Sequence, residues 1–337
     1  MTAFASAAAF EAALAELPGP DAGARAAAAA RQDCLTKPPG SLGRLEEIAI
    51  FMAGWQGRER PRLTRGRVVI FAGNHGVAVR GVSAYPPAVT AQMVANFRHG
   101  GAAINALAAA ADLELVVVPL NLDRPTADFT AAPAMDEADC LAALNAGAAT
   151  IADDLDLLVL GEMGIGNSTA AAALCAGAFG GDAHDWVGPG TGVVGDALAA
   201  KRAVVDAALS RHRPDATTPF EMLRRLGGRE IAAIAGALVT ARRARVPVLL
   251  DGFICGAAVA PLAAAHPAIV DHCLAGHCSA EPGHAALLRR LGIDPLLTLG
   301  LRLGEGSGAA VAASIIRAAL AMHDGMATFA EAGVATA

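Results

Sequence analysis

Aromatic side chains and basic runs are both scarce in this sequence of 337 residues. Phe, Trp and Tyr together make up 4% of it, and 26 lysines and arginines stand against 32 aspartates and glutamates, for a net charge of −6. A protein that binds nucleic acid usually presents a basic patch, often with aromatic rings on which bases stack. We therefore expect no nucleic-acid partner.

Long apolar runs are missing as well. Uncharged stretches such as 252–265 contain glycine and proline and are shorter than the roughly 18 residues that a membrane-spanning helix requires. The N-terminal residues include no basic segment, and Glu11 interrupts the apolar stretch that follows, which is untypical of a signal peptide. We expect a cytoplasmic protein that has no membrane partner.

The cysteines form no C-x-x-C pair, so the common zinc-binding pattern is missing. Segment 272–284 comes nearest to a metal site, because three histidines and two cysteines lie in it. A metal there stays the alternative to the simpler interpretation, in which all the thiols are reduced and structural. We predict no metal and no cofactor. The residues of the segment are His272, Cys273, His277, Cys278 and His284, and the other cysteines are Cys34, Cys140, Cys175 and Cys255.

Two widespread active-site motifs are absent, and the glycine-rich segment 161–166 does not match a third. The sequence lacks the G-x-x-x-x-G-K-[ST] of P-loop proteins, and the glycines of 161–166 stand in the wrong order for the dinucleotide-binding G-x-G-x-x-G. It lacks the G-x-S-x-G of α/β-hydrolases too. These observations disfavour a P-loop protein, a dinucleotide-binding fold and a serine hydrolase.

The chain does contain short β-branched runs that alternate with alanine-rich stretches of helical periodicity. Such alternation is typical of an α/β protein, in which helices cover both faces of a parallel sheet. We predict strands at 68–72, 113–118, 157–161, 246–251 and 295–299, with a weaker one at 269–274. We predict helices at 88–110, 136–153, 169–178, 195–211, 229–244, 282–291 and 307–322.

Residues 1–60 differ from the rest, because they are helical in pattern and contain no convincing strand. From residue 42 onward, Leu42, Leu45, Ile48 and Met52 fall on one helix face together with Ala49. We expect this segment to form a small helical attachment that packs with the last helix of the chain.

Glycine and polar residues follow nearly every predicted strand. Because ligands of an open parallel sheet bind beyond the carboxyl ends of its strands, these turns predict one shared site. The turns are 73–76, 81–86, 161–169, 251–253, 276–283 and 300–308.

Two glycine-rich loops, 161–169 and 188–192, lead into predicted helices, whose free backbone amides favour an anion such as phosphate. Lys201 lies in the helix after the second loop and could reach a phosphate or a carboxylate. Glycine-rich turns also arise for purely geometric reasons, so phosphate binding is one of two interpretations of these loops.

Four carboxylates lie in the turns, namely Glu162, Asp251, Glu281 and Glu305. A glutamate in a turn is usually solvated, but one that is held among glycines in a pocket can have a raised pKa and act as a general base. Glu162 and Glu305 are the best candidates for that role.

Seven segments together resemble one family, the nicotinate-nucleotide:dimethylbenzimidazole phosphoribosyltransferases. They follow the family's order from about residue 35 to 320, a span over which a chance match is implausible. The segments are KPPGSLGRLE (37–46), FAGNHG (71–76), GVSAYP (81–86), GEMGIGNST (161–169), VLLDGF (248–253), GHCSAE (276–281) and LRLGEGSG (301–308).

The resemblance implies transfer of the phosphoribosyl group of nicotinate mononucleotide to a ring nitrogen of 5,6-dimethylbenzimidazole, with inversion from β to α at C1′. The products would be α-ribazole 5′-phosphate and nicotinate, in the assembly of the nucleotide loop of cobalamin. The nicotinate ring loses its positive charge as it leaves, so it needs no general acid. With no pyrophosphate leaving group, the reaction needs no metal either.

By motif position, the resemblance implies that Glu305 is the general base that takes the benzimidazole N–H proton and that Glu162 lies near the ribose. It implies a benzimidazole site of Ser83, Gln92 and Leu303. It implies a site for the phosphate, ribose and nicotinate of the nucleotide at Gly164, Gly190, Thr191, Gly192, Lys201 and Ser279.

Members of this family are homodimers with a Rossmann-like parallel sheet and a small helical domain built from both chain ends. On this basis we predict a small domain of residues 1–60, completed by about 308–337, and a large catalytic domain of residues 61–307. Asn74 departs from the family pattern, which often has aspartate there, so we assign a catalytic role neither to Asn74 nor to His75.

Two other functions stay open at the level of the sequence. Acceptor choice depends on apolar residues that motifs do not fix, so a related transferase could prefer adenine or a phenol. The chain could also be a nucleotide-binding or regulatory module without activity, although such a module has no need of Glu162, Lys201 and Glu305.

Overall fold

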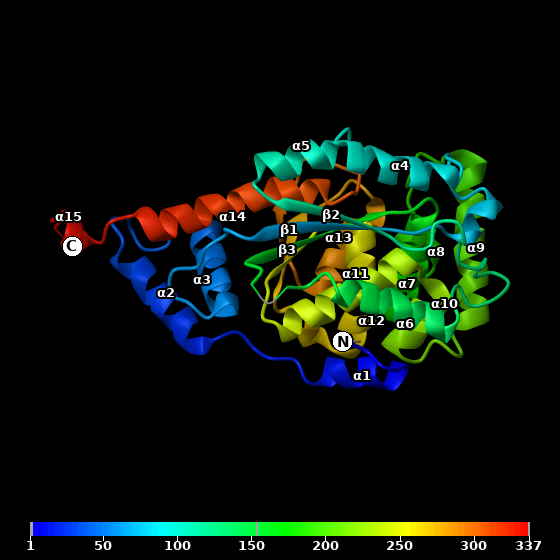
Figure 1. Ribbon diagram of the computed structural model, residues 1–337, viewed down its shortest axis with the longest axis horizontal. Helices are drawn as coiled ribbons and strands as arrows, with labels where there is room; N and C mark the ends of the chain where they lie inside the picture. Colours follow the sequence, from blue (N-terminus) through cyan, green and yellow to red (C-terminus); the bar gives the residue numbers. More distant parts are fainter. Residues whose placement is uncertain (1–2, 153, 336–337) are drawn as a thin grey trace.

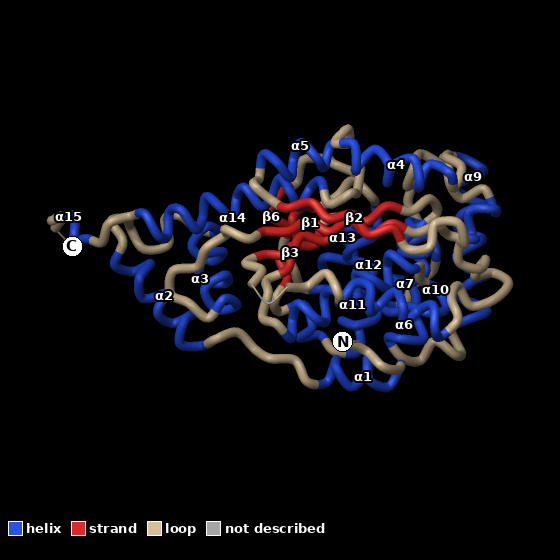
Figure 2. The backbone as a smooth tube through the Cα atoms, in the orientation of Figure 1, coloured by secondary structure: helices blue, strands red, loops and turns tan. Residues whose placement is uncertain are grey.

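The computed structural model describes residues 3–152 and 154–335. Within these ranges the sheet has six strands, all parallel, in the order β2-β1-β3-β4-β5-β6 (Figure 2). The strands are β1 (Gly66–Ala72), β2 (Glu114–Pro119), β3 (Leu157–Met163), β4 (Val248–Leu250), β5 (Cys273–His277) and β6 (Pro295–Leu297). The predicted α/β fold with a parallel sheet is confirmed.

The chain enters the sheet at β1, the second strand from one edge. β2 pairs with one edge of β1, where Val68 lies opposite Leu115, and β3 pairs with the other edge, where Val68 lies opposite Val159. The strand order therefore reverses between β1 and β3. The turns after these two strands border the crevice in which ligands of such sheets bind.

The central parts of β1 and β3 are apolar and buried, as expected of parallel strands that are covered on both faces. Alternate side chains of a strand point to opposite faces of the sheet. Val69 and Phe71 pack into one buried cluster, whereas Val68 and Ile70 pack into a second. The sheet thus lies between two hydrophobic layers.

Helices cover both faces of the sheet (Figure 1). One face carries α4 (Ala88–His99), α5 (Ala103–Ala110) and α14 (Ser307–Gly325), and the other carries α6 (Glu137–Ala148), α7 (Asn167–Phe179), α11 (Arg229–Arg243) and α12 (Phe253–Ala265). Further helices are α8 (Ala183–Trp186), α9 (Gly195–His212), α10 (Pro219–Leu226), α13 (Pro282–Leu291) and the 3₁₀ turns η1 (Gly76–Arg80) and η2 (Pro267–Val270).

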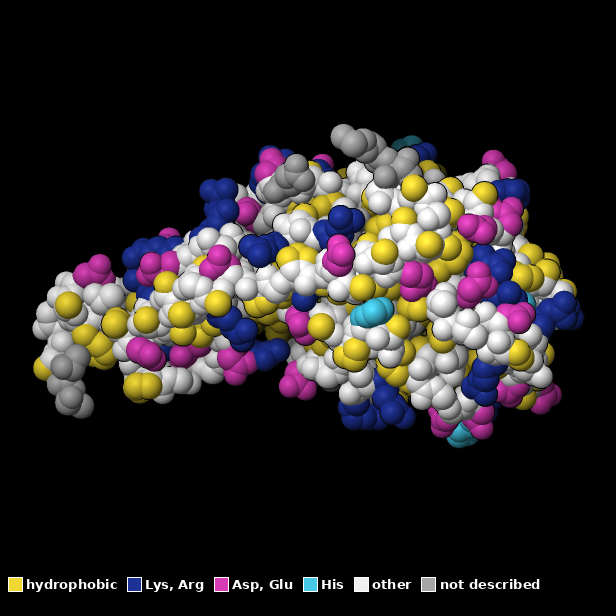
Figure 3. Space-filling view, turned by 90° about the horizontal axis from the view of Figure 1, so that it is seen from below, with side chains coloured by type: hydrophobic (Ala, Val, Ile, Leu, Met, Phe, Trp, Pro, Cys, Tyr) yellow, Lys and Arg dark blue, Asp and Glu magenta, His cyan; other side chains and the backbone are white. Residues whose placement is uncertain are grey.

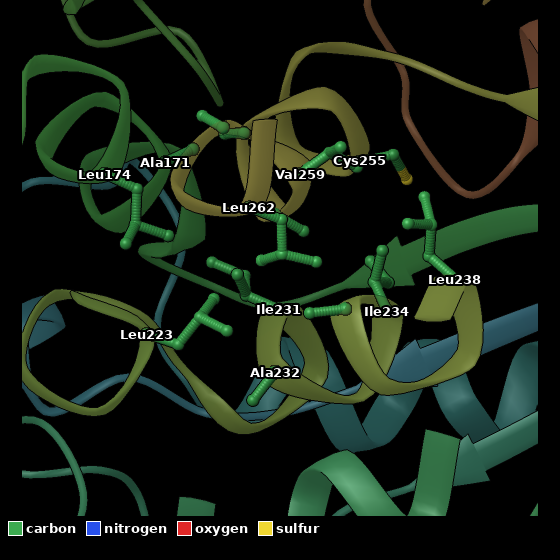
Figure 4. Packing of buried hydrophobic residues seen from close by; sticks show 14 of the residues in the cluster. Ala171, Leu174, Leu223, Ile231, Ala232, Ile234, Leu238, Cys255, Val259 and Leu262 are labelled. Carbon is green, nitrogen blue, oxygen red and sulfur yellow. The ribbon is translucent and has the colours of Figure 1, made fainter. Parts of the chain in front are cut away.

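The helices α6 and α11 touch through their backbones. A Cβ atom at Gly147 would lie 1.8 Å from the carbonyl oxygen of Ala233, so only glycine fits at that crossing. On its other side α11 packs against α12, where Ile231 and Ile234 lie near Leu262 (Figure 4). This layer of helices packs against the strands, and the turns that follow those strands form the site.

Both ends of the chain contribute to a projecting helical part (Figure 1). It contains α2 (Ala22–Cys34), α3 (Arg44–Gln56), the far end of α14 and α15 (Phe329–Ala332). Arg31 in α2 donates hydrogen bonds to the carbonyl oxygens of His323, Asp324 and Met326, at 2.8, 3.1 and 3.1 Å. These bonds tie α2 to the end of α14.

The first helix, α1 (Ala7–Ala15), lies elsewhere. It packs against α10, where the rings of Phe10 and Phe220 are 6.4 Å apart and the Phe220 amide donates to Glu11 at 2.7 Å. Burial of Phe10 and Leu14 fixes it there. Of the predicted small segment 1–60, α1 therefore lies on the large body, whereas α2 and α3 project from it.

Several element boundaries differ from the predicted ones. The helix predicted at 88–110 is broken after α4, because Gly100 adopts a left-handed conformation (φ +80°) and caps that helix. The weak strand predicted at 269–274 begins only at Cys273, because a 3₁₀ turn precedes it. The other five predicted strands overlap observed ones, to within a few residues at their ends.

Charged side chains of both signs are mixed over the face that Figure 3 shows, and basic ones do not gather into one patch there. Among residues 3–152 and 154–335, none of the helices combines the length and apolar character needed to cross a membrane.

Candidate active site

A cavity of about 330 Å³ opens at the carboxyl edge of the sheet. Its walls come from the end of β3 and the start of α7, from the turns after β4 and β5, from loop 188–192 and from the turn before α14. It thus lies beside the reversal of strand order between β1 and β3, where the topology of the sheet places a ligand.

Of the eleven residues predicted for the site, six line this cavity. Three do not line it but adjoin residues that do: Glu305 follows Gly304, Gly192 follows Thr191, and the Ser83 hydroxyl lies 2.9 Å from that of Thr191. Lys201 is buried behind loop 188–192, and Gln92 is exposed on α4. The six lining residues are Glu162, Gly164, Gly190, Thr191, Ser279 and Leu303.

Glu162 stands near the end of β3 and is almost fully buried. Burial raises its pKa to about 8; the hydrogen bond from the Asn167 amide opposes this rise, and the carboxylates of Glu230, Asp251 and Glu305 add to it. The neighbouring turn leaves no room beside it, since a Cβ atom at Gly304 would lie 2.4 Å from Glu162 Oε1. At neutral pH the surroundings of Glu162 therefore favour its protonated form.

Glu305 occupies an unusual backbone conformation. Its φ is +64°, in the left-handed region that only glycine adopts freely, and its neighbours Gly304 and Gly306 have φ of +81° and +78°. Burial, together with the nearby charge of Asp251, raises the pKa of Glu305 to about 7. A carboxyl group with this pKa is suited to accept a proton near neutral pH.

The opposite wall of the cavity offers groups for an anion. α7 begins at Asn167, after Gly166 in a left-handed conformation, and the positive end of its dipole lies at the cavity, which Asn167 and Ser168 line. Its Asn167 and Thr169 amides donate to the carbonyl oxygens of Gly164 and Gly166, at 3.2 and 3.1 Å. Behind this wall the Lys201 Nζ donates to Ser168 Oγ at 2.9 Å and to Gly188 O at 3.0 Å. Burial lowers the pKa of Lys201 to about 8, against the opposing effect of Glu281.

Glu281 also lies in this wall. Its Oε1 accepts a hydrogen bond from the Gly190 amide at 3.0 Å, and burial raises its pKa while the charges of Lys201 and Arg302 lower it. Arg302 is exposed at the mouth of the cavity. The anion side of the site thus combines a buried amine, a guanidinium and the N-terminus of α7 with one carboxylate.

The remaining wall is apolar and suits a flat aromatic ring. Its side chains come from the turn before α4, from the end of β3, from the start of α12 and from the turn before α14. They are Tyr85, Met163, Ile165, Phe253, Ile254 and Leu303.

Comparison with known proteins identifies the fold and the family. A family model described as Phosphoribosyltransferase matches residues 17–334. The chain belongs to this family. It is 69% identical to the nicotinate-nucleotide–dimethylbenzimidazole phosphoribosyltransferase of Novosphingobium aromaticivorans, over 99% of each chain, and 59% identical to that of Cereibacter sphaeroides, over 98% of each. The crystal structure of CobT from Thermus thermophilus matches with a TM-score of 0.87 and 44% identity, over 94% of this chain and 100% of that one.

Sequence analysis of this phosphoribosyltransferase missed several lining residues. Ser168, Phe253 and Arg302 lie inside the family segments without a predicted substrate contact, and Glu281 is predicted only as a turn carboxylate. The signal was present, because each of these residues follows a predicted strand at the same edge of the sheet.

The segment that came nearest to a metal pattern makes other contacts. The His284 Nδ1 accepts from the Ser279 amide at 2.9 Å, and the His272 ring lies 3.2 Å from the Leu238 carbonyl oxygen. Within residues 3–152 and 154–335 of this phosphoribosyltransferase, no three His, Cys, Asp or Glu side chains are grouped so that they could hold a metal ion. The six cysteines, all in the described part, are free thiols.

Proposed function

We propose that this phosphoribosyltransferase transfers the phosphoribosyl group of nicotinate mononucleotide to 5,6-dimethylbenzimidazole, in the assembly of the nucleotide loop of cobalamin. The names of its relatives support these substrates. The observation that carries the proposal is the pair Glu162 and Glu305, two buried carboxyl groups with pKa values raised toward neutrality. Glu162 lines the cavity, and Glu305 lies in the turn beside it. The products are α-ribazole 5′-phosphate and nicotinate.

The chemistry needs one proton acceptor. The ring nitrogen of the benzimidazole that carries no hydrogen attacks C1′ from the side opposite the nicotinate, so that configuration inverts from β to α. The C1′–N bond to nicotinate breaks, and its electron pair stays on the pyridine nitrogen. The proton on the second ring nitrogen of the benzimidazole passes to the Glu305 carboxylate, which restores a neutral azole ring.

Glu162 stabilises positive charge in this scheme. The sugar becomes cationic as the C1′–N bond lengthens, and the nicotinate ring of the bound nucleotide carries a positive charge from the start. A cation beside a carboxyl group lowers its pKa, so nucleotide binding favours the ionised form of Glu162. The carboxylate then stabilises the charge that develops in the transition state.

The remaining site residues divide between the two substrates. We assign Ser83, Gln92 and Leu303 to the benzimidazole, and the apolar lining supports this placement at Leu303. The N-terminus of α7 and the cations of the opposite wall support placement of the nucleotide there. We assign Gly164, Gly190, Thr191, Gly192, Lys201 and Ser279 to its phosphate, ribose and nicotinate.

We further propose a cytoplasmic homodimer in which residues 1–60, except for α1 on the large body, and about 308–337 form the small domain and 61–307 the catalytic domain. The bonds of Arg31 to the end of α14 support the joining of both chain ends. Tyr85, Leu299 and Leu303 are each more than half exposed, and this apolar surface at the site supports contact with a second copy.

Incubation of the protein with both substrates, followed by chromatography, tests the proposed activity. We expect nicotinate and α-ribazole phosphate in equal amounts, and we expect Glu305→Gln to fold normally but to lose nearly all nicotinate release. The exposed Glu47 on α3 provides the control, because it does not line the cavity, and we expect Glu47→Gln to leave turnover unchanged. Adenine and phenol are tested in parallel. Faster turnover with either compound would identify it, and not dimethylbenzimidazole, as the preferred acceptor. Binding of the nucleotide without any product would refute the assigned reaction.

A further inference from the structure

Asp251 is a buried carboxylate to which the reaction above gives no role. It directly follows β4, is 1% exposed and does not line the cavity. Its oxygens are nevertheless fully engaged with another part of the chain: Oδ2 accepts from the Gly306 amide at 3.1 Å, and Oδ1 accepts from the Ala309 amide at 2.9 Å. A side chain of one strand end thus holds the turn that carries Glu305.

These two bonds replace an ordinary helix cap. The first amides of a helix have no partner within it, and a polar side chain at the residue before the helix usually accepts from them. In α14 that residue is Gly306, which has no side chain. Asp251 therefore caps α14 from 55 residues away in the sequence.

The turn that is capped in this way needs an external constraint. An L-residue in the left-handed conformation of Glu305 is disfavoured, so the isolated turn would relax to another shape. On the side of β3 it is held by close contact, since a Cβ atom at Gly161 would lie 2.8 Å from the Gly306 nitrogen. On the side of β4 it is held by the carboxylate of Asp251.

The charge of Asp251 also acts on Glu305. Four ionisable groups surround Glu305. Three of them are Asp251 after β4, Glu162 at the end of β3, and Arg302 in the same turn. The fourth is His277 in β5, whose Nε2 lies 3.4 Å from Asp251 Oδ1. Burial and the charge of Asp251 are what raise the pKa of Glu305.

We propose that Asp251 is a positioning residue for Glu305: it fixes the left-handed turn through the Gly306 and Ala309 amides and places a negative charge behind the Glu305 carboxyl group. The role of Glu305 as a base rests on the proposed function, but the coupling between Asp251 and Glu305 is a property of the free protein. It can therefore be measured without any substrate.

Asp251→Asn is the decisive variant, because it preserves size while it removes the charge and leaves one terminal oxygen for two amides. Carbon NMR of protein labelled at the glutamate carboxyl carbons follows the titration of Glu305, whose signal is the one missing from Glu305→Gln. We expect the midpoint of this signal to fall by about one pH unit in Asp251→Asn. The low-pH limb of kcat/KM moves in the same direction, and kcat falls about 100-fold because the base is misplaced.

Asp156→Asn is the matched control. Asp156 is also buried, at 4% exposure, and its Oδ2 accepts from the backbone amides of Thr64 and Arg65 and from the Thr64 hydroxyl, at the opposite edge of the sheet. A merely structural effect of losing a buried carboxylate would appear in both variants. The proposal requires that only Asp251→Asn shifts the Glu305 midpoint.

An unchanged Glu305 midpoint in Asp251→Asn overturns the proposal, as does an equal shift in both variants. Should the Asn variant not fold, Asp251→Ser supplies a neutral side chain with a smaller hydrogen-bonding group. In the unmodified protein, a Glu305 midpoint in the ordinary range of a solvated glutamate overturns it without any variant. Absence of product from the unmodified protein would refute the proposed function alone, since the titration still reports on Asp251.

Discussion

Replacing Gly304 by alanine perturbs Glu162 through a single methyl group. The added Cβ would lie 2.4 Å from Glu162 Oε1, whereas ordinary contact begins at 3.4 Å, so one of the two groups must move by about 1 Å. A shift of this size at a reacting centre can reduce the rate about 100-fold. Alanine in the left-handed conformation of residue 304 (φ +81°) also destabilises the fold by about 1–2 kcal/mol.

Gly300→Ala separates these two effects. Gly300 has a similar φ of +69°, but within the described residues a Cβ atom there would meet nothing closer than 4 Å. Thermal unfolding is therefore expected to show comparable destabilisation of both variants. Initial rates of nicotinate release are expected to fall about 100-fold only for Gly304→Ala. Equal rates for the two variants would show that the position of Glu162 does not matter to turnover.

Two further predictions concern stability. The folded-state pKa of Glu162, about 8, lies above its ordinary 4.5, so the folded protein binds this proton more tightly and the free energy of unfolding falls as pH rises between these values. The free energy of unfolding of Glu162→Gln does not fall in this pH range. Urea unfolding at pH 9 should therefore show the variant to be more stable than the unmodified protein by about 1 kcal/mol or more, and at pH 5 the difference in stability should be smaller. Arg31→Ala removes the bonds between α2 and α14 and should cost about 1–3 kcal/mol, whereas Arg44→Ala, at an exposed ion pair with Glu47, should cost less than about 1. Equal losses for the two arginine variants would contradict the joining of the chain ends by Arg31.

The parallel sheet could be predicted because its strands are short, apolar and followed by glycine. That pattern is local, and the strands predicted from it contain the same residues, Val68–Ile70 and Leu157–Leu160, as the strands of the structure. The position of α1 could not be predicted in this way. It depends on contact between Phe10 and Phe220, which lie far apart in the chain and carry no local signal of their pairing.

The site shows the same division between local and distant information. Glu162 and Gly164 are at the cavity because they lie at the end of β3 and just after it, and the family segments identified them. The burial of Lys201 behind loop 188–192 depends on how α9 packs, which the spacing of residues does not fix. The hydrogen bonds between Asp251 and the start of α14 likewise join two turns whose proximity only the folded sheet creates.

The helix α14 has a mechanical consequence. Its 19 residues form one uninterrupted rod that begins beside Glu305 and ends at the carbonyl groups that Arg31 binds. At 1.5 Å per residue the rod is roughly 28 Å long, so a tilt of about 2° at one end displaces the other by about 1 Å. A tilt of the projecting helices by this amount would therefore displace the turn of Glu305 by about 1 Å.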